Sequence, residues 1–296
     1  MTEPPARPAP TPAPAAASGS NPRPRLVATD LDGTLLHDDK SVSTRTVRAL
    51  AAAEAAGVEV FFVTGRPARW MGVVSDHVHG HGLAICANGA AVVDLHRGGE
   101  IVRLRPLAQS DALTVVDALR EAAPGVSFAV ERTGGVHYEP EYPQFPLDPG
   151  GIIAPVEKLL SESAVDGDGR TVGDQPLLKL LARHPELDPD DFLTLGRTYA
   201  GAHAEFTRSS PSALLEISGP GVSKASTLAQ CCAERGIGPE EVVAFGDMPN
   251  DLEMLTWAGT SYAMANAHPA VLAATTHRTG SNEDDGVAVV IERLLA

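Results

Sequence analysis

The chain has 296 residues, of which 23 are Lys or Arg and 38 are Asp or Glu, so its formal net charge is -15. This acidic balance argues against a nucleic-acid partner, because affinity for a polyphosphate comes mainly from cations that displace its counterions. A polybasic membrane anchor is disfavoured for the same reason, and no apolar run reaches the roughly 18 residues of a membrane span. The length suggests one or two domains with a sizeable core.

The first segment, residues 1–24, holds eight of the 24 prolines together with many alanines. It lacks the charged start and the leucine-rich centre of a secretory signal, so we interpret it as a disordered or polyproline-like tail. The three cysteines form no CxxC pair and are odd in number, which suits a reducing compartment better than a disulfide framework. We therefore expect a cytoplasmic protein.

From residue 25 the sequence alternates between strand and helix patterns. Ser43 is a suitable N-cap and Gly57 a suitable C-terminal residue for a first helix, and a second helix is expected from Pro67. Strands are expected at 25–30, 58–63 and 83–87, and the continuous apolar run 58–63 is typical of a parallel strand buried on both faces. This alternation predicts an α/β fold with a doubly wound parallel sheet, whose ligands bind at the carboxyl ends of the strands.

The pattern changes after Asn88, where short strands alternate with helices as in an α+β fold. We expect strands at 91–93, 101–104, 126–130, 177–181, 204–207 and 213–217, and helices near 111–122 and 189–200. Buried-strand patterns return at 241–245 and 260–264, before a closing helix at 285–294. We therefore predict a discontinuous α/β core, residues 25–91 and 218–296, interrupted by an inserted α+β domain over residues 92–217.

Two carboxylates follow the first predicted strand, in the sequence Asp30-Leu31-Asp32-Gly33-Thr34. Residues two apart in an extended chain point to the same side, so Asp30 and Asp32 can share one ligand. Two like charges this close need a cation or a proton between them. Mg²⁺, which prefers carboxylate and phosphate oxygens, is the expected solution.

Polar groups also follow the later core strands. Thr64-Gly65-Arg66 comes directly before a predicted helix N-terminus, where free N–H groups favour an anion. The sequence Gly246-Asp247-Met248-Pro249-Asn250-Asp251 places two acids and an amide after another strand. Lys224, at the start of a helix that Ser223 can cap, supplies the positive charge that a phosphate needs.

These residues, in this order and at these strand ends, resemble the haloacid dehalogenase (HAD) superfamily of phosphatases. Only 31 residues separate Asp32 from Thr64, too few for an inserted domain as well as the helix, whereas the interval from Thr64 to Lys224 accommodates one. With Asn88-Gly89-Ala90 closing the first core segment and Gly221-Val222-Ser223-Lys224 opening the second, the chain is similar to Cof-type, or IIB, members with a C2-type cap.

The resemblance implies a role for each residue. Asp30 would attack phosphorus and form an aspartyl-phosphate. Asp32 would act as general acid and then as general base, for which it needs a proton that nearby negative charge favours. Mg²⁺ would be held by Asp30, the backbone carbonyl of Asp32 and Asp247, with Asp251 in support. The phosphoryl oxygens would be bound by Thr64, the Gly65 amide, Lys224 and Asn250, with Arg66 and Asn88 in supporting positions.

The sequence thus predicts a Mg²⁺-dependent phosphatase of small phosphorylated metabolites. Sugar phosphates are the default substrates, and nucleotide or vitamin phosphates are alternatives. Two other functions stay open, namely a phosphomutase of the same fold and a catalytically silent binding or scaffold protein. In the inserted domain, the candidates for substrate selection are His137, Tyr138 and Glu139.

Overall fold

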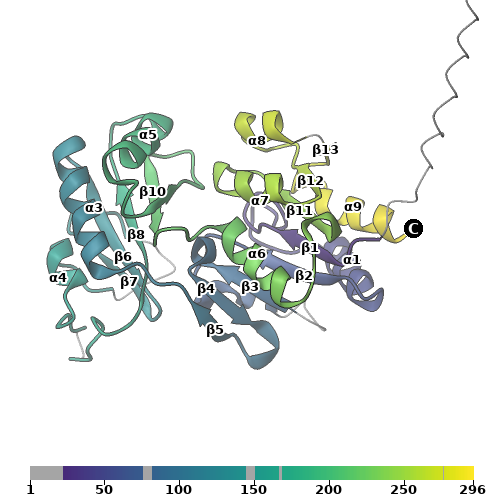
Figure 1. The fold of residues 1–296 in the computed structure, drawn as a ribbon, viewed down its shortest axis with the longest axis horizontal. Coiled ribbons are helices and arrows are strands. Elements are labelled where there is room, and N and C mark those ends of the chain that lie inside the picture. The colour runs from purple at the N-terminus through teal and green to yellow at the C-terminus, as the bar shows by residue number, and fades with distance from the viewer. Residues whose placement is uncertain (1–22, 76–81, 145–150, 167–168, 276) are drawn as a thin grey trace, which may run out of the picture.

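The computed structural model describes residues 23–75, 82–144, 151–166, 169–275 and 277–296. Apart from residues 23 and 24, the predicted tail lies outside them. The described chain forms two lobes, each built on its own sheet (Figure 1). None of the described helices is long and apolar enough to cross a membrane.

The larger lobe contains an eight-stranded sheet in the described residues, with the order β13-β12-β11-β1-β2-β3-β4-β5. Its central strand β1 (Leu26–Thr29) lies between β11 (Val242–Gly246) and β2 (Glu59–Val63), and every pair from β13 to β3 is parallel. The four residues of β1 are all buried, as a strand covered on both faces requires. The remaining strands are β3 (Gly82–Cys86), β4 (Ala91–Asp94), β5 (Glu100–Leu104), β12 (Thr260–Ala263) and β13 (His277–Arg278).

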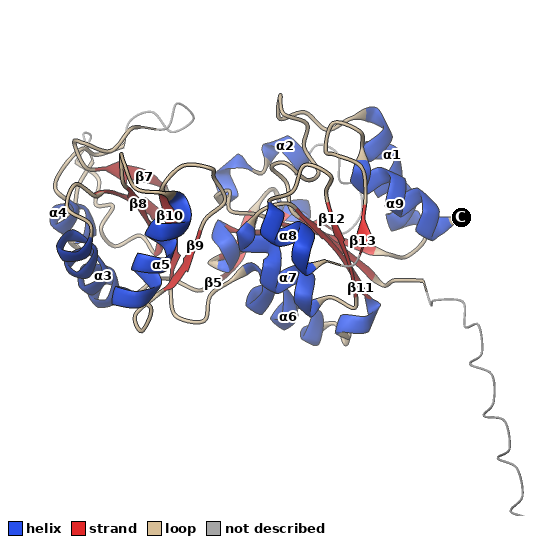
Figure 2. Cartoon of the chain, turned by 90° about the horizontal axis from the view of Figure 1, so that it is seen from above, coloured by secondary structure: helices blue, strands red, loops and turns tan. Residues whose placement is uncertain are grey.

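Helices cover both faces of this sheet. On one face α1 (Thr44–Ala55) packs against α9 (Gly286–Leu295), and on the other α6 (Lys224–Glu234) packs against α7 (Leu252–Trp257), with α8 (Pro269–Ala274) beside it (Figure 2). The first helix begins and ends as predicted. The Ser43 side chain accepts a hydrogen bond from the Thr46 amide, and Gly57 follows the helix with a φ of 79°.

Two expectations for the core are wrong in detail. β4 and β5 extend the core sheet, because β4 pairs antiparallel with β3 and β5 with β4. The chain turns back through Leu95–Arg97 and the left-handed Gly98, so it leaves the core sheet after residue 104 and not at residue 91. The helix expected from Pro67 is only a 3₁₀ turn (Ala68–Trp70) followed by the short α2 (Gly72–Ser75).

The smaller lobe, which we call the cap, has an antiparallel sheet with the order β7-β6-β8-β10-β9. Its strands are β6 (Ser127–Arg132), β7 (Gly135–Tyr138), β8 (Leu177–Arg183), β9 (Glu205–Thr207) and β10 (Leu214–Ser218), and its helices are α3 (Gln109–Ala122), α4 (Val156–Leu160) and α5 (Pro189–Ala200). These match the predicted elements to within two residues, except β7 and α4, which are too short to give a clear pattern.

The turn at Ala87–Gly89, which follows β3, packs against the start of α6. Gly89 has a φ of 105°, and a Cβ atom there would lie 2.4 Å from the backbone oxygen of Ser223, the residue that caps α6. Only glycine combines this conformation with this close approach. The turn therefore sets the place where Lys224 begins its helix.

We expect Gly89→Ala to destabilise the protein strongly, because the substitution adds a clash with backbone to the roughly 1–2 kcal/mol of left-handed strain. Gly57→Ala is the matched control, since Gly57 has a φ of 79° but nothing within 4 Å of its Cβ position. Urea unfolding of both variants measures the difference. Equal losses of unfolding free energy would contradict the role of the close approach.

Candidate active site

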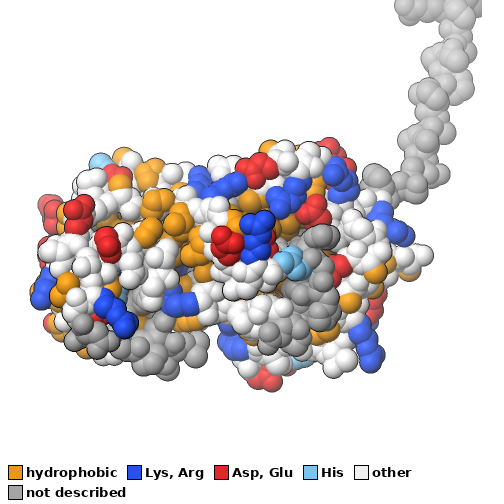
Figure 3. Space-filling model, turned by 90° about the horizontal axis from the view of Figure 1, so that it is seen from below, with side chains coloured by type: hydrophobic (Ala, Val, Ile, Leu, Met, Phe, Trp, Pro, Cys, Tyr) orange, Lys and Arg blue, Asp and Glu red, His pale blue; other side chains and the backbone are white. Residues whose placement is uncertain are grey.

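The carboxyl ends of the central parallel strands meet at a cavity of about 480 Å³ between the two lobes. Seen from below, apolar side chains gather between the lobes, next to acidic and basic ones (Figure 3). Most of the predicted site residues line this cavity, and they are Asp30, Asp32, Thr64, Gly65, Arg66 and Asn250. Lys224, Asp247 and Asp251 are buried and lie beside Asp30.

Lys224 joins two of the carboxylates. Its Nζ lies 2.6 Å from Asp30 Oδ1 and 2.7 Å from Asp251 Oδ1. Burial lowers the pKa of Lys224, but the charges of Asp251 and Asp30 outweigh burial and raise it, so the ammonium stays charged. The Ser223 side chain accepts a hydrogen bond from the Ser226 amide, and this cap fixes the start of the helix that carries Lys224.

Asp30, Asp247 and Asp251 form a buried cluster whose carboxylate oxygens lie within 4.8 Å of one another. Both oxygens of Asp251 are already engaged, Oδ1 by Lys224 and Oδ2 by the amides of Asp247 and Met248. Within the described residues, Asp30 Oδ2 and Asp247 Oδ2 accept no hydrogen bond. Carboxylate oxygens that accept no hydrogen bond are the ligands that a hard dication prefers. The cluster therefore fits Mg²⁺, with Asp251 orienting the other two acids.

The crowding of these acids changes their protonation. Burial raises the pKa of Asp30 well above its ordinary value; Lys224 opposes the rise, and the charges of Asp251 and Asp247 add to it. Burial and the charge of Asp251 raise the pKa of Asp247 to about 7, although Thr34 Oγ1 donates a hydrogen bond to its carboxylate at 2.8 Å. One ammonium among three carboxylates leaves negative charge that a bound cation would neutralise.

Asp32 differs from the prediction. Its carboxylate is outside the acidic cluster and makes a bidentate pair with Arg66, at 2.5 and 2.7 Å, and an ion pair with Lys40 Nζ at 3.0 Å. Partial burial raises the pKa of Asp32, but Arg66 and Lys40 outweigh burial and hold it below the ordinary value. The expectation that nearby negative charge keeps Asp32 protonated is therefore wrong in this arrangement, because the nearest charges are positive.

The two turns beside Asp30 supply the expected polar groups. The Thr64 hydroxyl accepts a hydrogen bond from the Arg66 amide at 3.1 Å, which leaves its own hydrogen free to donate. Asn88, buried and left-handed with a φ of 54°, accepts a hydrogen bond from Asn250 Nδ2 at 3.2 Å. The structure thus brings Thr64, Gly65, Asn88 and Asn250 together around one side of the cavity.

The sequence interpretation did not place in the site the charged residues that the cap contributes. Glu131, Lys179 and Glu216 line the cavity and are almost fully buried. A signal was present, because Lys179 and Glu216 interrupt the apolar runs LLKLL and LLEI. The proposed selectors His137, Tyr138 and Glu139 do not line this cavity, and Val136 of the same strand does. Their polar atoms serve the cap itself, since His137 Nδ1 and the Glu139 carboxylate accept hydrogen bonds from cap amides.

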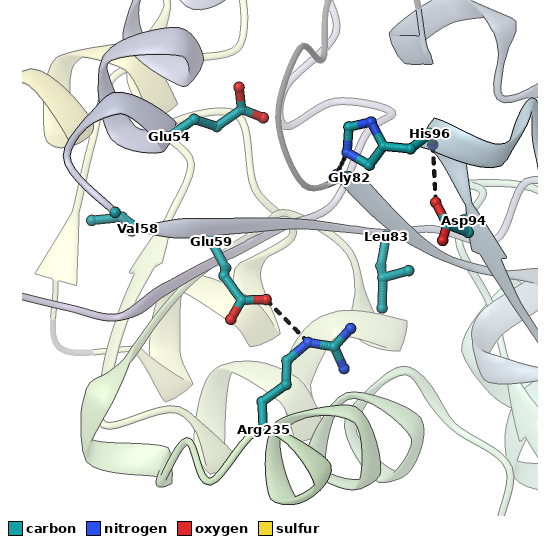
Figure 4. A pocket seen from close by; sticks show the side chains of 9 residues that line it. Glu54, Val58, Glu59, Gly82, Leu83, Asp94, His96 and Arg235 are labelled. Carbon is teal, nitrogen blue, oxygen red and sulfur yellow. Dashed lines mark hydrogen bonds and ion pairs between the residues drawn. The ribbon is translucent and has the colours of Figure 1, made fainter.

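A second cavity, of about 460 Å³, lies at the opposite edge of the core sheet, by the amino ends of β2 and β3 (Figure 4). Its arginine and its histidine are engaged by a neighbouring carboxylate and by backbone. Arg235 Nε lies 3.0 Å from Glu59 Oε2, and His96 Nε2 accepts a hydrogen bond from the Gly82 amide. This cavity contains none of the predicted site residues.

A family model described as haloacid dehalogenase-like hydrolase matches residues 27–291. The chain belongs to this family. It is 30% identical over 284 residues to the pyridoxal phosphate phosphatase of Escherichia coli, an alignment that covers 90% of this chain and 97% of the relative. A 5-amino-6-(5-phospho-D-ribitylamino)uracil phosphatase of Bacillus subtilis is 28% identical over 276 residues, covering 89% of this chain and 94% of that one.

Solved structures agree on the fold. A HAD phosphatase from Bacteroides thetaiotaomicron superposes with a TM-score of 0.74 at 22% identity, covering 96% of this chain and 99% of that one. A HAD subclass IIB sugar phosphatase superposes with a TM-score of 0.72 at 20% identity, covering 91% and 98%. The predicted α/β fold and the resemblance to Cof-type HAD hydrolases are confirmed, and with them the enzyme class, a HAD-type hydrolase of phosphoric monoesters.

The raised pKa of Asp247 predicts how stability depends on pH. Between about pH 4, the unfolded value, and about pH 7, the folded protein binds more protons than the unfolded chain. The free energy of unfolding of the metal-free protein should therefore fall as the pH rises through this window. Asp247→Asn should flatten that fall, whereas Glu253→Gln, at an exposed site, should not. Urea unfolding in a chelator at pH 5, 6, 7 and 8 measures the slopes, and parallel slopes for Asp247→Asn and wild type would contradict the assignment.

Proposed function

We propose that this hydrolase is a Mg²⁺-dependent phosphatase of small phosphorylated metabolites that works through an aspartyl-phosphate. The observation that carries the proposal is the position of Asp30. It lines the cavity at the end of the central strand, while Lys224 holds one of its oxygens and the other accepts no hydrogen bond within the described residues. A carboxylate held in this way is oriented for in-line attack on a bound phosphoryl group.

The reaction has two steps. An Asp30 oxygen forms a bond to phosphorus as the bond to the leaving alkoxide breaks, and Asp32 gives the alkoxide a proton. Water then attacks phosphorus, Asp32 accepts a proton from the water, and phosphate leaves with the Asp30 carboxylate restored. Thr64, the Gly65 amide, Lys224 and Asn250 would bind the phosphoryl oxygens, where the transition-state charge lies.

Asp32 can perform this role only if its ion pair with Arg66 changes. The lowered pKa of Asp32 follows from the Arg66 and Lys40 contacts. An incoming phosphoryl group carries two negative charges and competes for the Arg66 guanidinium. When Arg66 turns to the phosphoryl group, Asp32 loses its strongest partner and can take up the proton that it delivers to the leaving group.

The acidic cluster supports the need for a dication. Asp30 and Asp247, oriented by Asp251, would hold Mg²⁺ together with the backbone carbonyl of Asp32. When bound, the ion would neutralise the carboxylates and the charge of the phosphoryl oxygens. Without it, burial and the neighbouring acids raise the pKa values of Asp30 and Asp247 and so favour their protonated forms, which would weaken Asp30 as a nucleophile.

The cavity wall around the leaving group favours a ring over a polyhydroxylated chain. Trp70 and Met248 of the core face Val136, Leu181 and Leu214 of the cap across this cavity. The serine hydroxyls on the cap side are already engaged, because the Ser209 hydroxyl donates to Glu216 and those of Ser210 and Ser212 bond each other. Against this apolar wall, sugar hydroxyls would lose water and gain few partners, which is costly.

Among the substrates expected from the sequence, this lining shifts the preference from sugar phosphates towards vitamin and nucleotide-like phosphates. The name of one relative points the same way, since it acts on pyridoxal phosphate. The other acts on a phosphoribitylaminouracil, in which a polyhydroxylated chain joins the phosphate to the ring. A mutase remains separable by experiment, because it would transfer the phosphoryl group to a second sugar position and release no phosphate.

Asp30→Asn should lower the hydrolysis of p-nitrophenyl phosphate by at least about 1000-fold, since it removes the nucleophile. The amide oxygen can still accept from Lys224, so the fold should survive, which circular dichroism checks. Glu253→Gln is the control and should keep the wild-type rate. Near-normal turnover of a folded Asp30→Asn variant would refute the nucleophile assignment.

A panel of phosphomonoesters, assayed for phosphate release with Mg²⁺ and with a chelator, tests the cofactor and the substrate class together. We expect activity only with Mg²⁺, and kcat/KM at least about tenfold higher for pyridoxal phosphate than for glucose 6-phosphate, as one well-packed apolar contact can supply. Equal activity in the chelator would exclude the metal. A preference for hexose phosphates would restore the sugar-phosphate prediction, and isomer formation without phosphate would indicate a mutase.

A further inference from the structure

Three neighbouring strands of the cap each carry one charged residue on the face towards the core. These residues, which we call the cap ladder, are Glu131 on β6, Lys179 on β8 and Glu216 on β10. Side chains alternate between the faces of a strand, and the alternate neighbours Val130, Leu180 and Ile217 pack into the apolar core of the cap. Each ladder residue is at most 4% exposed, which is rare for charged groups unless they are paired.

Lys179 uses all three of its donors. Its Nζ lies 2.7 Å from Glu216 Oε2 and 3.2 Å from Glu131 Oε2, both in the cap. The third contact crosses to the core, where Nζ lies 2.7 Å from the backbone oxygen of Gly65. Because an ammonium has three hydrogens, these contacts fully satisfy it, and one of them is with the turn predicted to bind phosphate.

The two glutamates of the cap ladder also reach the core. Glu216 Oε2 accepts a hydrogen bond from Asn88 Nδ2 at 2.8 Å, and Glu131 Oε1 accepts one from Arg69 Nη1 at 3.2 Å. The fit is close, because a Cβ atom on Gly65 would lie 3.1 Å from Glu216 Oε2. The cap ladder therefore touches both turns that border the phosphate side of the cavity, Thr64–Arg66 and Ala87–Gly89.

The contact with Gly65 also orients other groups. Its carbonyl and the Arg66 amide belong to one planar peptide group, so holding the oxygen fixes the direction of the N–H. That N–H donates to the Thr64 hydroxyl, which directs the remaining hydroxyl hydrogen. Through Asn88, Glu216 is linked to Asn250 as well. Four residues expected to bind or support the phosphoryl oxygens are thus linked to Lys179 or Glu216. They are Thr64, Gly65, Asn88 and Asn250.

We propose that Lys179 and Glu216 are positioning residues that complete the phosphate-binding site when the cap lies closed on the core. If the cap opens, the pairs within the cap ladder stay intact, and only the contacts with Gly65, Asn88 and Arg69 are exchanged for water. Opening therefore leaves no unpaired buried charge in the cap. It nevertheless releases the two turns that border the phosphate side of the cavity, Thr64–Arg66 and Ala87–Gly89. The substrate would be admitted to a loosened site that becomes ordered on closure. This inference rests on the proposed phosphatase function.

The test replaces the charged ladder by a neutral one. Lys179→Met alone would strand two buried carboxylates and could unfold the cap, so the main variant combines Glu131→Gln, Lys179→Met and Glu216→Gln. Glu216→Gln alone keeps the shape and serves as the milder variant. Arg120→Met is the matched control, because Arg120 makes an ion pair with Glu139 at 2.8 Å within the cap and contacts neither turn.

Hydrogen exchange and kinetics are the two readouts. In the triple variant, the amides of residues 64–66 and 87–89 should exchange at least about tenfold faster, and inorganic phosphate should inhibit at least about tenfold more weakly, as expected for a lost charge-assisted hydrogen bond. Glu216→Gln should change the exchange rates and the inhibition by phosphate in the same direction but by less. Arg120→Met should change neither, even if its melting temperature falls.

The proposal would be overturned if the triple variant showed the wild-type exchange rates and the wild-type inhibition by phosphate. It would also be overturned if Arg120→Met lost as much exchange protection and phosphate inhibition as the triple variant. If the triple variant does not fold, Glu216→Gln decides by the same two readouts. The exchange measurement uses the enzyme without substrate. An inactive wild type would therefore refute the phosphatase function while exchange still judged the cap ladder.

Discussion

The site depends on a single buried ammonium that holds two carboxylates apart and in place. Lys224 contacts Asp30 and Asp251 at 2.6 and 2.7 Å, and all three side chains are almost fully buried. Removing the lysine would leave buried carboxylates without their counter-charge, at a cost of about 3–5 kcal/mol. The arrangement is tolerated because Asp251 also accepts hydrogen bonds from two backbone amides. These amides, in the turn after β11, stabilise its negative charge.

The fold brings these groups together because of the order of the strands. β1 lies between β2 and β11, so residues 30, 64 and 247, far apart in the sequence, meet at one edge of the sheet. The turn at Ala87–Gly89 then packs against the start of α6, where the Thr227 hydroxyl donates to the Gly89 oxygen at 2.9 Å. Parallel strands thus set the distances in the site, and one glycine turn sets the position of Lys224.

The core acids and Lys224 could be predicted from the sequence because each follows a strongly apolar strand or a clear helix cap. Such signals are local and do not depend on long-range contacts. It did not predict the partners of Asp32. Arg66 was expected beside a phosphate, and Lys40, at a left-handed φ of 69° in the loop before α1, gave no pattern. The cap ladder was missed for a similar reason, because Glu131, Lys179 and Glu216 come from three strands whose pairing order the sequence does not state. Local patterns identify which residues can react, whereas long-range pairing decides their charge state.

The division of charge between the two lobes has a consequence for function. The chain carries a net charge of -15, and the core acids add negative charge where an anionic substrate must bind, so the cations that attract it have to lie close by. The cap contributes none in excess, because its Lys179 is paired with both Glu131 and Glu216. Beside these paired charges, the cap adds to the cavity the apolar wall of Val136, Leu181 and Leu214. In the proposed reaction, charge would control the phosphate side of the cavity and shape the leaving-group side. Substitutions in that wall would then change the preferred substrate while the reacting groups in the core stay as they are.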